Sequence, residues 1–175
     1  MPKCPEQLLP QLLEKVEKYT KAGWWVESNV ESASPLLCIQ KKNGSLRTVV
    51  DARERNANTV KDLTPFPDQD TIRNACARVH FRMKLDMSDA YEQIHVDPDD
   101  IWKTAFATVV GTLLSNVMQK GGCNAPSTFQ QLMSRLFRRQ IGRYVFVYLD
   151  GIFYSTMIEE HEEHLKVVFE ILREN

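Results

Sequence analysis

The sequence predicts an α+β fold, in which helices are interspersed with short antiparallel strands. Two observations support this prediction: several segments carry apolar residues at helical spacing, and others are short β-rich runs joined through hairpin-type turns. A chain of 175 residues is long enough to bury one domain or two small lobes. We therefore expect a small antiparallel sheet backed by helices.

The first helix is expected over residues 6–22, because apolar residues recur there at helical spacing and Gly23 follows the last turn. We assign this helix a scaffolding role. Two β-rich runs come next, over 36–42 and 46–51, joined through Asn43-Gly44, which is a strong hairpin signal.

The turn type decides which side chains of this first hairpin share a face. If Asn43 and Gly44 are the two loop residues, Gln40 lies opposite Arg47. Lys42 and Arg47 then project from the same face of the hairpin.

The rest of the chain alternates between the two patterns. Ser127 and Gln130 have the spacing of a capping box at the start of one helix, and Asp150-Gly151 separates two β-rich runs as a second hairpin turn. The expected elements are a helix over 68–78, a strand over 80–87, a β-type stretch over 104–114, a helix over 127–140, strands over 144–149 and 152–155, and a helix from 158 onward.

Composition excludes several classes of protein. The chain is 43% hydrophobic and 26% charged with a net charge of -1, which is ordinary for a globular protein and unlike a disordered tail. No apolar run approaches the roughly 20 residues that a bilayer requires, and the amino-terminal residues lack a signal peptide. The four cysteines form no CxxC pair, so we expect neither a zinc site nor disulfides. We expect an intracellular protein, cytoplasmic or nuclear, without a membrane partner.

The charge is distributed unevenly along the chain. Residues 41–61 hold six basic and two acidic side chains, and residues 135–143 hold four arginines without an acid, whereas residues 157–175 hold six glutamates. Local basic patches can bind phosphates although the molecule as a whole is neutral. The same residues could equally be solvated surface charge, and their spacing leaves both interpretations open.

Two aspartates follow β-rich segments that could be neighbours in one sheet. Asp86 follows the strand-like run 81–85, and Asp150 lies at the second hairpin. Magnesium prefers hard oxygen ligands, and carboxylates that hold two metal ions can stabilise both oxygens of a phosphoryl displacement. Taken alone, this pair is weak support for a metal site, because Asp-Gly is a common turn sequence.

Seven motifs follow one another along the chain in a fixed order. They are Lys41-Lys-Asn-Gly-Ser-Leu-Arg47, Val50-Asp-Ala-Arg-Glu-Arg-Asn56, Leu85-Asp-Met-Ser-Asp-Ala-Tyr91, Thr104-Ala-Phe106, Asn124-Ala-Pro-Ser-Thr-Phe-Gln130, Tyr148-Leu-Asp-Gly151 and Glu159-Glu-His-Glu-Glu-His-Leu165. Together they strengthen the interpretation of a metal site, because over roughly residues 30–175 the chain resembles the reverse transcriptases of Gypsy-class LTR retrotransposons, of a fungal type.

The resemblance implies the fingers and palm of an RNA-directed DNA polymerase, a nucleotidyltransferase that adds deoxynucleotides to a primer 3′-hydroxyl with two Mg²⁺ ions. Its partners would be an RNA or DNA template-primer and deoxynucleoside triphosphates; the oligomeric state stays open. The expected organisation is fingers over 1–61 and 94–124 and palm over 62–93 and 125–175. We expect the thumb and ribonuclease H domains of the family to be absent.

The resemblance also implies a role for each matching residue. Asp86, the Met87 carbonyl and Asp150 would bind metal, with the two aspartates as catalytic residues. Tyr91 would be the steric gate that disfavours a 2′-hydroxyl. The residues expected to contact the nucleotide are Lys41 or Lys42, Arg47, Asp89, Ala90, Tyr91, Lys120 and Gly121. Gln119-Lys120 replaces the Pro-Phe common in the class, which weakens the assignment of Lys120.

One position departs from the family pattern. The family turn is Tyr-x-Asp-Asp, whereas this chain has Gly151 in place of the second aspartate. A lost carboxylate relieves like-charge repulsion and weakens metal binding. We therefore expect Gly151, together with the missing thumb, to impair polymerisation. The alternative is a catalytically inactive, retroelement-derived module that binds nucleic acid or protein. His161 and His164 are expected to be solvated surface residues rather than metal ligands.

Overall fold

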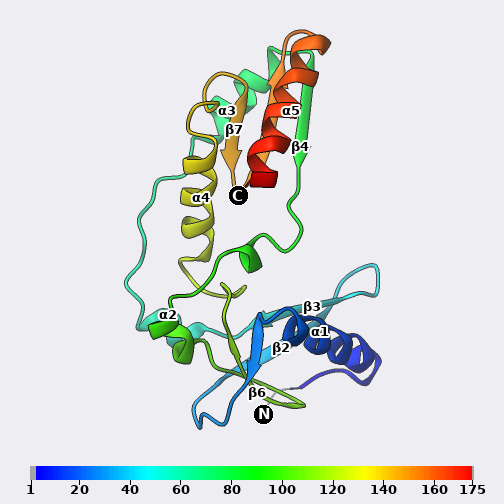
Figure 1. The fold of residues 1–175 in the computed structure, drawn as a ribbon, viewed down its shortest axis with the longest axis vertical. Coiled ribbons are helices and arrows are strands. Elements are labelled where there is room, and N and C mark those ends of the chain that lie inside the picture. The colour runs from blue at the N-terminus through cyan, green and yellow to red at the C-terminus, as the bar shows by residue number, and fades with distance from the viewer. Residues whose placement is uncertain (1–2, 175) are drawn as a thin grey trace. The chain divides into compact units, whose positions relative to one another are not determined.

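The computed structural model describes residues 3–174, and the side chains of Asp150, Ile152 and Phe153 lie outside this description. The chain divides into two compact units, each assembled from two separate stretches of sequence. Unit 1 comprises Met1–Lys61 and Asp89–Ala125, and unit 2 comprises Asp62–Ser88 and Pro126–Asn175. The expected segment 62–93 is thus divided, with 89–93 in unit 1. Figure 1 shows the elements of each unit.

Unit 1 is built on a mixed five-stranded sheet with the order β1-β6-β5-β2-β3. Strands β2 and β5 run parallel, whereas the other pairs are antiparallel. The elements of unit 1 are η1 (Glu6–Leu8), α1 (Leu9–Lys21), β1 (Trp25–Glu27), β2 (Ser34–Gln40), β3 (Leu46–Val50), α2 (Arg53–Ala57), η2 (Tyr91–Gln93), η3 (Pro98–Thr104), β5 (Phe106–Thr108) and β6 (Gly111–Ser115).

The core of unit 1 lies between α1 and this sheet. Leu12 of α1 packs with inward residues of all five strands in one apolar cluster, in which Phe106 is fully buried. Tyr19 joins the cluster through its ring, whose centroid lies 4.6 Å from that of Trp25. The expected helix over 6–22 is confirmed as η1 followed by α1.

The register of the β2–β3 hairpin differs from the expected one by one residue. Arg47 lies opposite Ile39, and Lys41 donates its N–H to Ser45 O at 2.8 Å, so the loop has three residues and ends at Gly44 with φ 81°. A one-residue change in register reverses the face of every side chain. Lys41 therefore continues the face of Ile39 and Arg47, while Lys42 lies in the loop.

The expected β-type stretch over 104–114 is two strands rather than one. β5 ends at Thr108 and β6 begins at Gly111, which has φ 135°. The Thr108 hydroxyl accepts from Val110 N–H and donates to Gly111 O, and these bonds close the tight turn. The alternation of apolar and polar residues did not indicate this turn, which depends on the short side chain of Thr108.

Unit 2 carries the expected small antiparallel sheet, with the order β4-β8-β7. Three helices accompany the strands, and Figure 1 shows α5 alongside the sheet. The elements are α3 (Gln69–Ala77), β4 (Phe81–Leu85), α4 (Ala125–Leu136), β7 (Val145–Tyr148), β8 (Asp150–Ser155) and α5 (Ile158–Glu174). The core includes Met133, Phe137, Val145, Val147 and Val168, none more than 2% exposed.

The two histidines of α5 are structural rather than solvated, contrary to expectation. His161 is buried, and the Nδ1 atoms of His161 and His164 lie 3.2 and 2.8 Å from the buried Ser155 hydroxyl. The His164 ring also stacks on Tyr144 with a centroid distance of 3.7 Å. The neighbouring glutamates suggested an exposed helix face. The spacing of three residues nevertheless places both histidines on the side of α5 that faces β8.

Among the described residues, no helix combines the length and apolar character needed to cross a membrane. The four cysteines are free thiols. Burial, with a contribution from neighbouring Cys4, raises the pKa of the Cys38 thiol to about 12.

Candidate nucleotide and metal site

The backbone of unit 2 brings the positions of Asp86 and Asp150 together. Leu85, the last residue of β4, pairs with Gly151 of β8, so Asp86 and Asp150 occupy the next register position along the two antiparallel strands. Asp86 is exposed and Met87 is half-buried. The side chain of Asp150 lies outside the described residues, whereas its backbone is the first position of β8.

The second hairpin turns at Leu149 rather than at Asp150-Gly151. Tyr148 pairs directly with Asp150, and Leu149 alone joins β7 to β8 in a left-handed conformation with φ 60°. Asp150 and Gly151 belong to β8, so the expected turn was placed too late in the sequence. Asp-Gly is a strong turn signal, but other contacts of unit 2 override it here.

Gln130 on α4 supplies those contacts. Its side chain is 1% exposed; Nε2 donates to Val147 O at 3.0 Å, and Oε1 accepts from Leu149 N–H at 2.9 Å. The capping box expected for Gln130 with Ser127 is absent from the described contacts, because α4 begins two residues earlier, at Ala125. Sequence reasoning found this residue but assigned it to the wrong partner.

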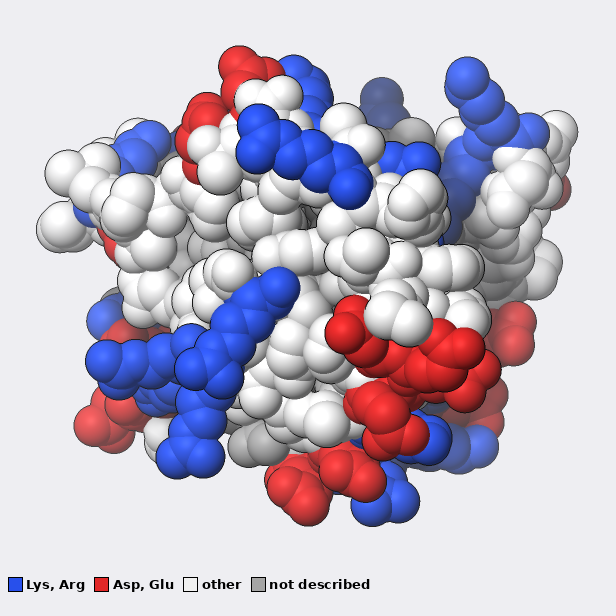
Figure 2. Space-filling model, turned by 90° about the horizontal axis from the view of Figure 1, so that it is seen from above, with Lys and Arg blue, Asp and Glu red and all other residues white. Residues whose placement is uncertain are grey.

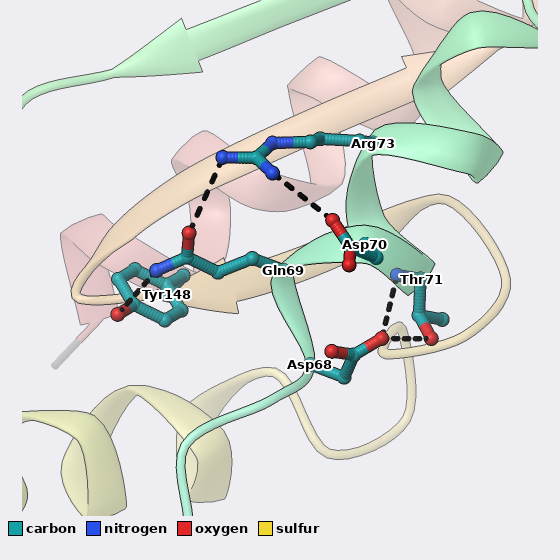
Figure 3. Close-up of polar contacts among 6 residues, drawn as sticks. All are labelled: Asp68, Gln69, Asp70, Thr71, Arg73 and Tyr148. Carbon is teal, nitrogen blue, oxygen red and sulfur yellow. Dashed lines mark hydrogen bonds and ion pairs between the residues drawn. The ribbon is translucent and has the colours of Figure 1, made fainter.

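Tyr148, which directly precedes Leu149, is held by the segment around α3. Its hydroxyl accepts from Gln69 Nε2 at 2.7 Å, as Figure 3 shows, and its ring packs against Phe66. Gln69 is oriented in turn by Arg73, which donates to both Gln69 Oε1 and Asp70. Asp68 caps α3 by accepting from Thr71 N–H and hydroxyl, and these bonds lower the pKa of Asp68.

Unit 1 holds the residues expected to contact the nucleotide, and several of them share a polar cluster. Asp89, with φ 50°, accepts from the Tyr19 hydroxyl at 3.3 Å and lies 3.9 Å from Lys18 Nζ. The Tyr19 hydroxyl also lies 3.3 Å from buried Glu92, which pairs with Lys120 Nζ at 3.5 Å. Burial, together with the charges of Glu92 and Asp89, raises the pKa of Tyr19. The structure thus connects Asp89 and Lys120 through Tyr19 and Glu92.

Helix α1 contributes to this cluster, although the sequence suggested only a scaffold. Lys15 Nζ donates to Thr48 Oγ1 at 2.8 Å and lies 4.6 Å from the centroid of the Tyr19 ring. Burial lowers the pKa of Lys15. Lys15 and Tyr19 are four residues apart on the buried face of α1, and this spacing was the available signal.

Gly121 lies where no side chain fits. Its φ is 122°, and a Cβ atom would stand 2.3 Å from the carbonyl oxygen of Val50. Val50 N–H donates to the Lys120 carbonyl at 3.1 Å, while the Asn56 side chain bonds both Gly121 O and Cys123 N–H. The glycine therefore permits the 120–123 segment to lie directly against β3.

The remaining expected nucleotide contacts are on two other segments of unit 1. Arg47 is exposed on the face of the hairpin that Lys41 continues, whereas Lys42 lies in the loop. Ala90 precedes η2, and Tyr91, the expected steric gate, begins it. Tyr91 is half-buried.

The arginines of residues 135–143 form an exposed cluster at the end of α4. They are Arg135, Arg138, Arg139 and Arg143. Within the described part of the chain none of the four forms an ion pair, whereas Arg73 pairs with Asp70 at 3.0 Å. Figure 2 shows, in the view from above, one group of Lys and Arg side chains at the lower left and one group of Asp and Glu side chains at the lower right, with further basic side chains along the upper edge.

Residues 39–175 match the family of reverse transcriptases (RNA-dependent DNA polymerases). The chain belongs to this family. It is 32% identical over 161 residues to the Retrovirus-related Pol polyprotein from transposon 297 of Drosophila melanogaster, covering 89% of this chain and 15% of the polyprotein. Its relatives include LTR-retrotransposon polyproteins of the gypsy and Tf2 groups, and this similarity does not specifically establish a fungal type.

A shorter relative covers much of the same region. The RNA-directed DNA polymerase homolog of Oenothera berteroana is 34% identical over 130 residues, covering 72% of this chain and 92% of the homolog. Against the transposon 297 and opus polyproteins, by contrast, this chain spans only 15% and 17% of their length.

Solved structures confirm the α+β fold. The foamy viral protease-reverse transcriptase in complex with double-stranded DNA superposes with a TM-score of 0.89 at 22% identity, covering 99% of this chain and 31% of that chain. The same viral protein in complex with an RNA/DNA hybrid gives a TM-score of 0.87 at 21% identity, covering 99% and 24%.

Proposed function

We propose that this reverse transcriptase domain adds deoxynucleotides to a primer 3′-hydroxyl under the direction of an RNA or DNA template, with activity impaired by Gly151. The observation that carries the proposal is the register of the three-stranded sheet. Because Leu85 pairs with Gly151, the two aspartates of the family motifs stand at neighbouring positions, Asp86 directly after β4 and Asp150 at the start of β8. We assign the palm role to unit 2 and the fingers role to unit 1.

Asp86, Asp150 and the Met87 carbonyl would hold magnesium. The donor set fits this ion, because carboxylate and carbonyl oxygens are hard ligands and Asp86 is accessible to solvent. The described residues include no group of three His, Cys, Asp or Glu side chains that could hold a metal; the Asp150 side chain is not among them. When bound, two magnesium ions would neutralise charge on the phosphate oxygens and increase the nucleophilicity of the primer hydroxyl.

Unit 1 would bind the incoming deoxynucleoside triphosphate. Arg47 and Lys41 share one exposed hairpin face, so their fixed cations can pair with phosphate oxygens. Asp89 and Ala90 would meet the triphosphate through their backbone, and Tyr91 would exclude the 2′-hydroxyl. Lys120 already pairs with Glu92, which makes it a weaker candidate for a nucleotide contact.

Gly151 removes a carboxylate next to the metal ligands. Its backbone pairs with both Leu85 and Val147, so it lies within the central strand at the level of the site. Affinity for divalent ions depends on ligand charge. We therefore expect weak metal binding and slow polymerisation in the chain as it stands.

Primer extension by the parent chain and by Gly151→Asp tests this proposal. We expect the variant to extend a primer at least about tenfold faster, because roughly 1.4 kcal/mol of additional transition-state stabilisation corresponds to a factor of ten. Asp86→Ala in either background is the control and should abolish extension. Equally robust extension by the parent and by Gly151→Asp would contradict impairment; extension that survives Asp86→Ala would contradict the site itself.

A second candidate function is a non-catalytic nucleic-acid-binding module. The exposed arginines at the end of α4 favour it, because guanidinium groups that have no carboxylate partner among the described side chains are available to phosphates. Binding of a template-primer that is independent of both magnesium and Asp86 would support this function over polymerisation. Binding that requires both would exclude it.

A further inference from the structure

The turn between β7 and β8 adopts a backbone conformation that its own sequence does not favour. Leu149 has φ 60°, a left-handed conformation that a Cβ atom disfavours. The following dipeptide, Asp150-Gly151, is by contrast well suited to a two-residue hairpin loop. A loop at Asp150-Gly151 would pair Leu149 with Ile152, which changes the register by an odd number of residues.

Such a change would remove Asp150 from its position beside Asp86. In the observed register Asp150 is the first residue of β8 and pairs with Tyr148. In the alternative register it would lie in the loop, and the strand residues after it would exchange faces. The sequence therefore offers two hairpins, of which one places both aspartates at the same end of the sheet.

Gln130 bonds the backbone at the end of β7 and at the turn residue Leu149. Its amide group donates to Val147 O at 3.0 Å and accepts from Leu149 N–H at 2.9 Å, and Nε2 also lies 3.2 Å from Ser134 Oγ. The side chain is 1% exposed, so these bonds are protected from competing water. A carboxylate could not donate to Val147 O, and an apolar side chain could make neither bond.

We infer that Gln130 is a positioning residue that selects the register of the β7–β8 hairpin, and through it the position of Asp150 opposite Asp86. The buried amide stabilises the left-handed Leu149 turn over the competing Asp150-Gly151 turn. Gln69 assists by donating to the hydroxyl of Tyr148, the last residue of β7, as seen in Figure 3. The importance of this position for metal binding rests on the proposed function, whereas the selection of register does not.

The test compares Gln130→Ala with Gln131→Ala, a matched control on the same helix. Gln131 is exposed and bonds Asp62 and Thr64 instead of the turn. Amide hydrogen exchange by NMR reports the Leu149 bond, and cross-strand NOE contacts between Gly151 and Leu85 report the register. Binding of Mn²⁺ alone, measured by calorimetry, reports the metal site.

We expect Gln130→Ala to reduce Leu149 amide protection at least about tenfold and to weaken the Gly151–Leu85 contacts. We expect Mn²⁺ affinity to fall about 10- to 100-fold, as for other residues that orient metal ligands. Gln131→Ala should change neither. Adding Leu149→Gly to Gln130→Ala should restore the register and most of the Mn²⁺ affinity but not the protection of amide 149, because glycine adopts positive φ without a Cβ penalty.

The rescue by Leu149→Gly distinguishes a positioning role of Gln130 from a general loss of stability. A glycine in the turn would not restore the register and the Mn²⁺ affinity if Gln130→Ala had simply destabilised the fold. Unchanged register and protection in Gln130→Ala would overturn the inference, as would a loss that Leu149→Gly fails to reverse. If Gln130→Ala does not fold, Gln130→Glu retains the acceptor for Leu149 N–H and is expected to show an intermediate loss. Absence of Mn²⁺ binding in every chain, Gly151→Asp included, would contradict the proposed function, and the NMR contacts would still decide the role of Gln130.

Discussion

The close approach of neighbouring backbone can constrain the identity of a residue in this protein as strongly as a role in ligand binding would. Gly121 matches a family position expected to contact the nucleotide, yet the structure gives it a packing reason of its own. The Val50 carbonyl occupies the space that a side chain would need. A glycine retained for nucleotide contact and one retained for packing look the same in sequence, and only the neighbouring strand distinguishes them.

Gly121→Ala should therefore destabilise unit 1 strongly. We expect the free energy of unfolding to fall by about 3 kcal/mol, because positive φ and a backbone clash act together. Gly23→Ala is the control: its φ is 72° with no atom within 4 Å of the added Cβ, and a loss of about 1 kcal/mol is expected. Urea unfolding measures both; equal losses would show that the Val50 contact relaxes easily.

At the scale of elements, the helices and the strand pairs were predictable, but the hairpin registers were not. Helical periodicity located α1, α3, α4 and α5 because each buries one apolar stripe. Both turns were misplaced, since Asn43-Gly44 ends a three-residue loop and Asp150-Gly151 lies within β8. The position of the first turn depends on one extra loop residue, and the position of the second depends on Gln130 of α4. The sequence around each turn indicates neither of these.

The same limits apply to the candidate site. Asp86 and Asp150 could be found because chemistry and order along the chain mark them. Tyr19 and Glu92 could not, because their roles arise from a buried contact between α1 and η2 that spans 73 positions of the chain. The short strand β1 and the parallel pairing of β2 with β5 were likewise invisible, since three-residue strands carry too little pattern.

The corrected register of the first hairpin predicts which lysine binds triphosphate. In a Gly151→Asp background we expect Lys41→Ala to weaken deoxynucleotide binding about tenfold, as loss of a charge-assisted phosphate contact would. Lys42→Ala should change it by less than about threefold, because Lys42 lies in the loop rather than on the Arg47 face. Equilibrium nucleotide binding of the two variants is the measurement, and a larger effect at Lys42 would show that the loop side chain reaches the nucleotide.

At the scale of the whole molecule, a net charge of -1 conceals opposite local charges. Exposed arginines follow α4, while exposed glutamates occupy the first turns of α5. Electrostatic affinity for a polyanion depends on such local groups rather than on the sum. The composition therefore did not exclude a nucleic-acid partner.

Replacing Arg135, Arg138, Arg139 and Arg143 by alanine should reduce the salt dependence of nucleic-acid binding. If all four contact phosphates, the slope of log K against log salt should become smaller by about 3. Arg73→Ala is the matched control, because Arg73 already pairs with Asp70. Fluorescence anisotropy over a salt series measures the slope, and an unchanged slope would identify the cluster as solvated surface.

The interleaving of the two units has a consequence for synthesis of the chain on the ribosome. The sequence of unit 1 is complete once residue 125 has been made, whereas among the described residues the partner strand of β4 is β8, through contacts such as Leu85 with Gly151. At roughly 5–20 residues per second, β4 waits about 3–13 s for its partner strand. During that interval the nascent chain presents an unpaired strand edge, so this is the period in which a chaperone or a neighbouring nascent chain has the greatest opportunity to bind it.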